Sequence, residues 1–218
     1  MLTITKKFHL FDAFGIPIYV DLTFLGIVLL CMISMGISGV MFAVMLAFSI
    51  VAHEYGHALT ARMFGFKTND ITLSILGGCA SLLGMPKDTA EEMSVAVMGP
   101  VVSFLLFGVG AVCYSIIGTD VIAAFAATNL VLGIFNLMPG FPMDGGRVLR
   151  AILCSKMPRV KATEWAMKVG RGFACLLALY GFVMICMGNF GGACSILIAV
   201  MIWKVGKMEY DTVVKYGC

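Results

Sequence analysis

The stretch that decides the fold is V-M-F-A-V-M-L-A-F-S-I-V-A-H-E-Y-G-H-A-L-T-A-R-M-F-G, residues 40–65. It is long and apolar enough to cross a bilayer, which takes about 20 residues of helix. It nevertheless carries His53, Glu54 and His57 in its second half. Ionisable side chains are costly in hydrocarbon and mark functional sites where they occur. The stretch therefore predicts a membrane-spanning helix with a polar site inside it.

These three polar residues form the pattern H-E-x-x-H. His53 and His57 lie one above the other on one face of a helix, so both imidazoles can reach one zinc ion at about 2.0–2.1 Å. Glu54 is then placed to act as general base on a water at the metal. The alternative is two interior histidines satisfied by hydrogen bonds. It is disfavoured because the chain has only 3 histidines and two of them bracket this glutamate. We predict a site for one zinc ion per chain.

A second stretch, N-L-M-P-G-F-P-M-D-G-G-R at 136–147, offers the third ligand that such a zinc site needs. Its prolines and glycines break a helix, and irregular backbone at membrane depth persists only where protein or a water-filled cavity surrounds it. A rise of about 1.5 Å per residue places this break and the histidines at similar depth, in the cytoplasmic third of the bilayer. We expect Asp144 to bind the metal; a role as turn residue or helix N-cap is the alternative.

Asn136, beside the break, has two equally supported roles. Its amide can donate to an oxyanion during amide hydrolysis, which would make it catalytic. It can instead hydrogen-bond to a neighbouring helix, as asparagines in membranes do. Asn129 lies on the same helical face, seven residues earlier, and for it we favour the structural role.

The composition places the whole chain in a membrane. Of its 218 residues, 61% are hydrophobic and 12% are charged, and so few charges could not cover a soluble core of this size. We expect an all-α polytopic membrane protein, one domain over 1–218, with a small membrane-associated β element. Its six transmembrane helices are expected at about 16–37, 40–64, 91–118, 120–138, 164–187 and 189–206.

The lysines and arginines indicate how the protein is oriented. They lie at the N-terminus, in or beside the loops that join spans two to three and four to five, and after span six. By the positive-inside rule, both termini of this multi-pass protein are cytoplasmic, and the cell membrane is its expected location. The net charge of +3 is thus explained by topology, and we expect no nucleic-acid partner.

Two segments alternate between apolar and polar residues in the manner of strands. Residues 8–18 suggest a short strand or hairpin at the membrane surface, and residues 66–84 suggest a hairpin that turns at Gly77-Gly78. The second hairpin either captures an extended substrate at its edge or only packs within the helix bundle. The pattern alone does not separate these two roles.

Together these residues resemble the site-2 protease family of membrane zinc metalloproteases. The similarity covers nearly the whole chain and rests on H-E-Y-G-H (53–57), L-G-G-C-A (76–80), M-G-P-V-V-S-F (98–104) and the Asp-Gly motif within 136–147. It implies a six-helix fold with a three-helix catalytic core at about 40–150. It also implies zinc held by His53, His57 and Asp144, with Glu54 as base. The implied substrates are transmembrane helices of other proteins, cleaved within the lipid bilayer.

The chain departs from the family pattern at Ser103, where members often carry Asn. We expect no PDZ domain between spans two and three and no CBS domain after the core. A membrane transporter and a catalytically silent membrane scaffold are the alternative functions. A transporter predicts related halves, yet no repeat relates residues 1–109 to 110–218. A scaffold would not require the glutamate that is present at position 54.

Overall fold

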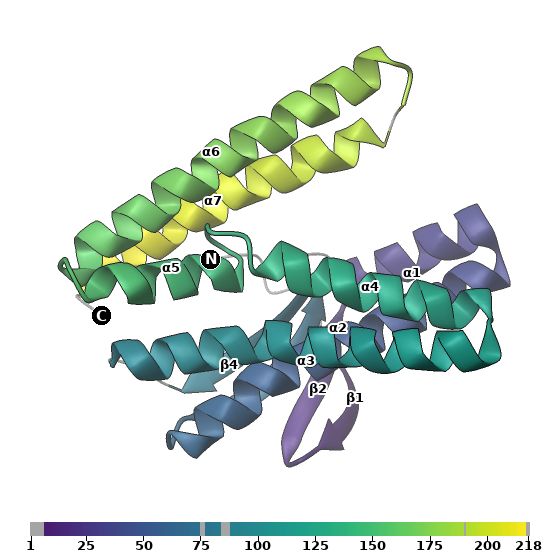
Figure 1. Cartoon of the computed structure of the whole chain (residues 1–218), viewed down its shortest axis with the longest axis horizontal. Helices are drawn as coiled ribbons and strands as arrows, with labels where there is room; N and C mark the ends of the chain where they lie inside the picture. Colours follow the sequence, from purple (N-terminus) through teal and green to yellow (C-terminus); the bar gives the residue numbers. More distant parts are fainter. Residues whose placement is uncertain (1–6, 75–76, 84–87, 190, 217–218) are drawn as a thin grey trace. The chain divides into compact units, whose positions relative to one another are not determined.

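The computed structural model of the protein describes residues 7–74, 77–83, 88–189 and 191–216. The chain is mostly helical and has one small sheet. Its strands are β1 (Lys7–Ala13), β2 (Ile16–Asp21), β3 (Lys67–Ser74) and β4 (Gly77–Leu83). Its helices are α1 (Leu22–Met35), α2 (Ile37–Met63), α3 (Thr89–Ile117), α4 (Asp120–Asn136), α5 (Asp144–Cys154), α6 (Arg159–Cys186) and α7 (Gly192–Tyr216). Contacts within the chain define two compact units (Figure 1): unit 1 is Met1–Met85 with Met98–Ile134, and unit 2 is Pro86–Val97 with Phe135–Cys218.

The sheet belongs to unit 1 and joins two hairpins. β1 and β2 pair antiparallel, as do β3 and β4, so both alternating segments form strands as expected. The parallel pairing of β2 with β3 makes one sheet in the order β1-β2-β3-β4, which the alternation did not indicate. Ile16, Ile18 and Ile71 of these strands are fully buried with Tyr55 and Ala58 of α2. The sheet is therefore anchored on the helix that carries the two histidines.

The predicted start of the first apolar span is wrong. Residues 16–21 form strand β2, and α1 begins only at Leu22. The Asp21 carboxylate caps this helix by accepting hydrogen bonds from the backbone amides of Thr23 and Phe24, at 2.9 and 3.0 Å. An apolar run by itself does not distinguish a buried strand from a buried helix. Pairing makes residues 16–21 a strand: the neighbouring strand β1 pairs with them along their whole length, and β3, far along the chain, pairs with the three residues from Ile18 to Val20.

The predicted turn at Gly77-Gly78 is also wrong, because both glycines belong to β4. Residues 75 and 76, which precede them, lie outside the described residues. A Gly-Gly pair signals either a turn or a close backbone approach. Here Gly77, with a φ of 103°, is the strand residue that ends the hairpin opposite Ser74, and Gly78 makes a close approach to Glu54.

Small residues bring the helices of unit 1 close together. A Cβ on Gly56 of α2 would lie 2.5 Å from the carbonyl oxygen of Met98 in α3. A Cβ on Gly110 of α3 would lie 3.0 Å from the Cβ of Ala126 in α4. Close contact through small residues is the usual way in which helices pack in a membrane. Unit 1 thus holds α2 and most of α3 and α4 as a packed group of three.

The helices place the protein in a membrane. Within the described parts of the chain, α2, α3 and α6 are long and apolar enough to cross a bilayer. Two further apolar helices are shorter, α1 with 14 residues and α4 with 17. α7 has 25 residues but carries charges from Lys204 onward. The chain is a membrane protein with three candidate spans by length and composition.

Unit 2 is built on the antiparallel pair of α6 and α7, green and yellow in Figure 1. Both helices extend past the apolar spans expected from the sequence, α6 by beginning at Arg159 and α7 by continuing to Tyr216. Met143, which precedes Asp144, is buried in one cluster with residues of both helices, namely Ala174, Ala199 and Ile202. The turn that leads into Asp144 therefore packs on this helix pair.

Candidate metal centre

The two histidines of α2 face each other at the spacing that a shared metal requires. Both are buried, with 3% of His53 and 5% of His57 exposed. Their Nε2 atoms are 3.3 Å apart, and the rings stand at 80° to each other. Two nitrogens bound at about 2.0–2.1 Å to one tetrahedral zinc lie about 3.3–3.4 Å apart. The geometry of the pair is therefore that of two zinc ligands.

Gly99 of α3 makes room beside these nitrogens. A Cβ at this position would lie 2.2 Å from Nε2 of His57 and 2.7 Å from Nε2 of His53. Any larger residue would occupy the space into which both lone pairs point. Gly99 was part of the motif M-G-P in the sequence, but its role depends on how α3 crosses α2. The residues present thus fit a metal ion at the two Nε2 atoms.

Ser103, one turn further along α3, orients the first histidine. Its Oγ lies 2.9 Å from Nδ1 of His53, and the contact is buried. In the tautomer with hydrogen on Nδ1, the hydroxyl accepts that hydrogen and Nε2 presents its lone pair to the metal. Such partners of ligating histidines set the tautomer and the ring orientation. The sequence identified Ser103 only as a departure from the family pattern and missed this role.

Glu54 lies half-buried on α2, directly after His53. It packs against the backbone of β4, where a Cβ on Gly78 would lie 2.4 Å from its Cγ and 2.9 Å from its Oε1. A side chain at position 78 would displace the carboxylate. Gly78, the second glycine of the pair predicted to form a turn, thus leaves room for the side chain of Glu54.

Asp144 is the first residue of α5 in unit 2, and 8% of it is exposed. The N-cap of this helix is Met143, which forms no side-chain cap, so the alternative that made Asp144 the cap is not borne out. The following glycines, in the first turn of α5, let this helix pack closely on the segment before it. A Cβ on Gly145 would lie 2.3 Å from the Leu137 carbonyl oxygen, and one on Gly146 would lie 2.5 Å from the carbonyl carbon of Gly140.

A cluster of four charged residues, two of them buried, holds α5 within unit 2. Arg150 of α5 donates from Nε to Oε1 of Glu92 at 2.8 Å and from Nη1 to Oε1 of Glu209 at 2.7 Å. Arg159 pairs with the other oxygen of Glu92 at 2.9 Å. The guanidinium of Arg150 also stacks over the ring of Phe141, 4.9 Å from its centroid, in the turn before Asp144. Charge pairs and stacking thus connect α5 to α3, α7 and its own turn, and α3 in turn to α6.

Comparison with known proteins identifies the family to which the chain belongs. Residues 41–119 and 116–177 match the sequence profile of peptidase family M50. The chain belongs to peptidase family M50. A zinc metalloprotease of Methanocaldococcus jannaschii is 37% identical over 185 residues, which cover 80% of this chain and 54% of that protein. A relative in Synechocystis, also named as a zinc metalloprotease, is 34% identical over 82% of this chain and 51% of its own length.

The M50 chain is also similar to a solved structure. The site-2 protease from Methanocaldococcus jannaschii is 31% identical, with a TM-score of 0.72, covering 94% of this chain and 95% of the solved one. The M50 chain spans about half the length of the curated relatives it matches. Zinc is the metal named for these relatives, and the paired imidazoles of α2 suit it, since zinc prefers nitrogen, sulfur and carboxylate ligands.

The two asparagines of α4 have different positions. Asn129 is fully buried in unit 1, where its Nδ2 donates to Oγ of Ser49 on α2 and to the Phe125 carbonyl oxygen, both at 3.0 Å. It has the structural role that the sequence favoured. Asn136 is half-buried at the end of α4, in unit 2. Whether it acts in catalysis or in packing stays a prediction.

Proposed function

We propose that this M50 chain is an intramembrane zinc metalloendopeptidase that cleaves transmembrane segments of other membrane proteins, as in regulated intramembrane proteolysis. The observation that carries the proposal is the buried pair of Nε2 atoms, 3.3 Å apart, on a helix long and apolar enough to span a bilayer. A metal site at that position acts on peptide bonds within the membrane rather than in bulk water. The 31% identity to a solved site-2 protease supports the same activity.

His53, His57 and Asp144 are the proposed ligands of one zinc ion. Each is buried and offers a nitrogen or a carboxylate oxygen, which are donors that zinc accepts. Asp144 stands in the Asp-Gly motif, inside the stretch that matches the M50 profile. Three protein ligands leave one position open, as a zinc site that acts on water needs.

Glu54 is the proposed general base and acid. When bound, zinc supplies a Lewis acid that lets water lose a proton near neutral pH. The carboxylate of Glu54 takes that proton as the water oxygen attacks the scissile carbonyl carbon. It then delivers the proton to the amine nitrogen as the carbon–nitrogen bond breaks. The Nδ2 group of Asn136 is a proposed donor to the carbonyl oxygen, which gains negative charge during the attack.

We further propose that residues 1–218 act as one membrane-embedded domain. α1, α2, α3, α4, α6 and α7 would provide the six spans, with the catalytic core at about 40–150 and both termini in the cytoplasm. The packing of α2, α3 and α4 through small residues supports such a core. The absence of Lys and Arg between Arg171 and Lys204 supports an outward-facing connection between α6 and α7.

The test is cleavage by the purified protein in detergent. The protein is incubated with a candidate single-span substrate, with and without a zinc chelator, and compared with the Glu54→Gln variant. Glutamine keeps the size of the side chain but cannot accept the proton, so we expect cleavage to stop while elemental analysis still finds about one zinc per chain.

Each outcome of this test has a distinct meaning. Cleavage by Glu54→Gln at a rate near that of the unmodified protein would remove Glu54 as the base. Zinc without cleavage of any substrate, in the unmodified protein, would favour a catalytically silent scaffold. Cleavage that persists after zinc has been removed would exclude the metal mechanism altogether.

A further inference from the structure

The α6–α7 pair of unit 2 has a long segment without charge that ends in a basic band. No Asp, Glu, Lys or Arg occurs from Gly172 to Trp203. Arg171 of α6 ends this segment on one helix and Lys204 of α7 ends it on the other. Ala174 and Ala199 lie together in the core between the helices, so the two ends of the segment lie at about the same level of the antiparallel pair. The boundary between apolar and basic residues is where a bilayer interface is expected.

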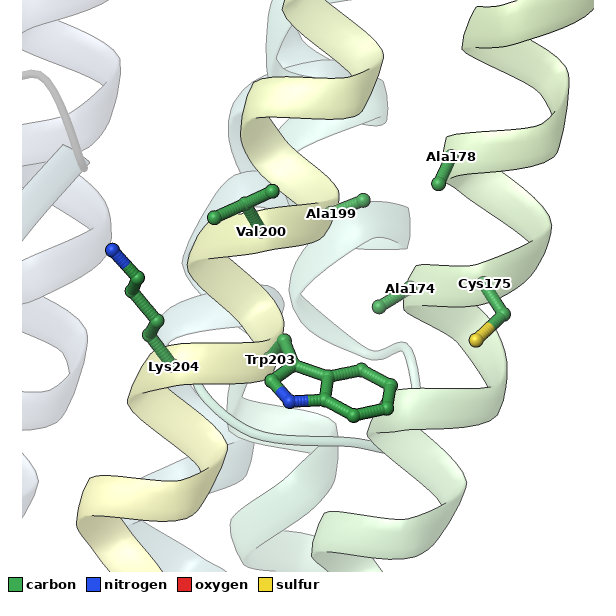
Figure 2. Close-up of a pocket in the computed structure, with 7 residues that line it drawn as sticks. All are labelled: Ala174, Cys175, Ala178, Ala199, Val200, Trp203 and Lys204. Carbon is green, nitrogen blue, oxygen red and sulfur yellow. The ribbon is translucent and has the colours of Figure 1, made fainter.

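A cavity opens on the apolar side of this boundary (Figure 2). Its volume is 230 Å³, and its lining is made up of Ala174, Cys175, Ala178, Ala199, Val200, Trp203 and Lys204. The three alanines form a notch: Ala174 and Ala199 are its buried floor, and Ala178 is partly exposed above them. Figure 2 shows the indole of Trp203 reaching from α7 towards α6 across one end of the cavity. Tryptophan is the residue that favours the headgroup level of a membrane.

One basic residue, Arg171, lies against Trp203 at this end of the cavity, and a second, Lys204, lines it from α7 with its side chain directed away from α6 (Figure 2). The guanidinium of Arg171 stacks over the ring of Trp203, 4.7 Å from its centroid, and its buried Nε has no hydrogen-bond partner. In the part of the chain that the structure describes, neither Arg171 nor Lys204 forms an ion pair. By contrast, Lys168 is paired with Glu164 at 2.7 Å. The mouth of the cavity therefore carries uncompensated positive charge.

We propose that this groove binds one anionic phospholipid. An acyl chain lies over the exposed side of the notch, along Cys175, Ala178 and Val200, and the phosphate lies at the level of Trp203 beside Arg171, with the long side chain of Lys204 turning towards it on binding. The size of the cavity favours a lipid chain over a protein helix, because a helix with side chains is about 10–12 Å wide. Basic pockets between membrane helices are suited to anionic headgroups. The floor of this site, Ala174 and Ala199, also packs against Met143 beside Asp144, but none of the residues proposed for proteolysis lines it, and the proposal does not depend on that function.

The test uses the fluorescence of Trp203. The chain has 2 tryptophans, so Trp165→Phe leaves Trp203 as the single emitter. The protein is placed in nanodiscs of phosphatidylcholine that contain increasing fractions of brominated phosphatidylglycerol or of brominated phosphatidylcholine. Each basic residue near the headgroup contributes about 1 kcal/mol, or about fivefold in affinity. We expect half-maximal quenching at a mole fraction at least fivefold lower for the anionic lipid.

Three variants separate the proposed site from general surface charge. Lys204→Gln leaves the Arg171–Trp203 stack in place and should reduce the preference for the anionic lipid about fivefold. Ala178→Leu fills the notch and should reduce quenching by both lipids. Lys215→Gln removes an exposed charge from the same helix and should change nothing. The proposal would be overturned if, without these three substitutions, the two brominated lipids reached half-maximal quenching at the same mole fraction. It would also be overturned if Lys215→Gln and Lys204→Gln changed the preference for the anionic lipid equally.

Discussion

The histidine region of unit 1 and the aspartate turn of unit 2 are held in place by different means. His53 and His57 lie on one regular helix, beside the bare backbone of Gly99, and Ser103 adds one uncharged hydrogen bond. Asp144 follows an irregular turn, and the helix that it begins is held by a cluster of four charges around the buried pair of Arg150 and Glu92.

This difference reflects how much geometry each backbone supplies. A helix already places residues four apart on one face, so the histidines need only space and an orienting partner. A turn has no such internal repeat, so the position of Asp144 depends on packing and charge pairs with distant elements. We therefore expect substitutions around the histidines to affect the metal more than the fold, and substitutions in the charge cluster to affect the fold first.

The largest effect is expected from His57→Ala, which removes one of the two nitrogens from α2. Zinc content should fall from about one per chain to near zero, and proteolysis should stop with it, because two ligands do not complete a zinc site. Elemental analysis of the purified protein measures the first effect and substrate cleavage the second. His9→Ala is the matched control, since His9 is an exposed histidine paired with Asp12. Full zinc content in His57→Ala would exclude the pair as the metal site.

Arg150→Met tests the charge cluster on the aspartate side. It leaves Glu92 buried without its main partner, and breaking a buried ion pair costs about 3–5 kcal/mol. We expect a clear fall in the midpoint of thermal unfolding in detergent. Lys168→Met removes the cation of an exposed pair with Glu164 and should cost no more than about 1 kcal/mol. Equal unfolding midpoints for the two variants would show that the cluster does not hold unit 2 together.

Gly99→Ala tests the space beside the histidines. The new methyl group would lie 2.2 Å from Nε2 of His57 unless the helices move apart. A displacement of about 1 Å at a catalytic site costs on the order of 100-fold in rate, and we expect a loss of that size in proteolysis. Gly108→Ala is the matched control on the same helix, because its Cβ would meet nothing within 4 Å. If both variants cleave substrate equally well, the space at Gly99 does not serve the metal.

The smallest effect is expected from Ser103→Ala, which removes the hydroxyl beside Nδ1 of His53. Loss of such an orienting partner typically weakens metal affinity about 10-fold, up to 100-fold. Competition with a fluorescent zinc chelator measures this change, while the thermal unfolding midpoint of the protein loaded with excess zinc should stay the same. Ser94→Ala removes an exposed hydroxyl that bonds to the Ala90 carbonyl of the same helix and should leave zinc affinity unchanged. A fall in stability without a change in affinity would assign Ser103 a packing role only.

The paired histidines could be predicted from the sequence because their arrangement depends on residues that are close together in the chain. The spacing of His53 and His57 determines that they share a helical face, whatever surrounds the helix. The alternation in 8–18 and 66–84 indicated strands for the same reason. Local pattern did not reveal where residues 16–21 end as a strand and α1 begins, since both segments are apolar. It also could not show that β2 pairs with β3.

The sequence by itself therefore determined the family, the membrane setting, the paired histidines and the base candidate at Glu54. Only the tertiary structure decided which residues lie against them: Gly99 at the nitrogens, the Ser103 hydroxyl at Nδ1 of His53 and Gly78 at Glu54. It alone paired Arg150 with Glu92, 58 residues before it, and with Glu209, 59 residues after it. The physical reason is that a repeat of two or 3.6 residues sets only which side chains share a face. Contacts between distant residues depend on how whole elements pack, and no local repeat encodes that.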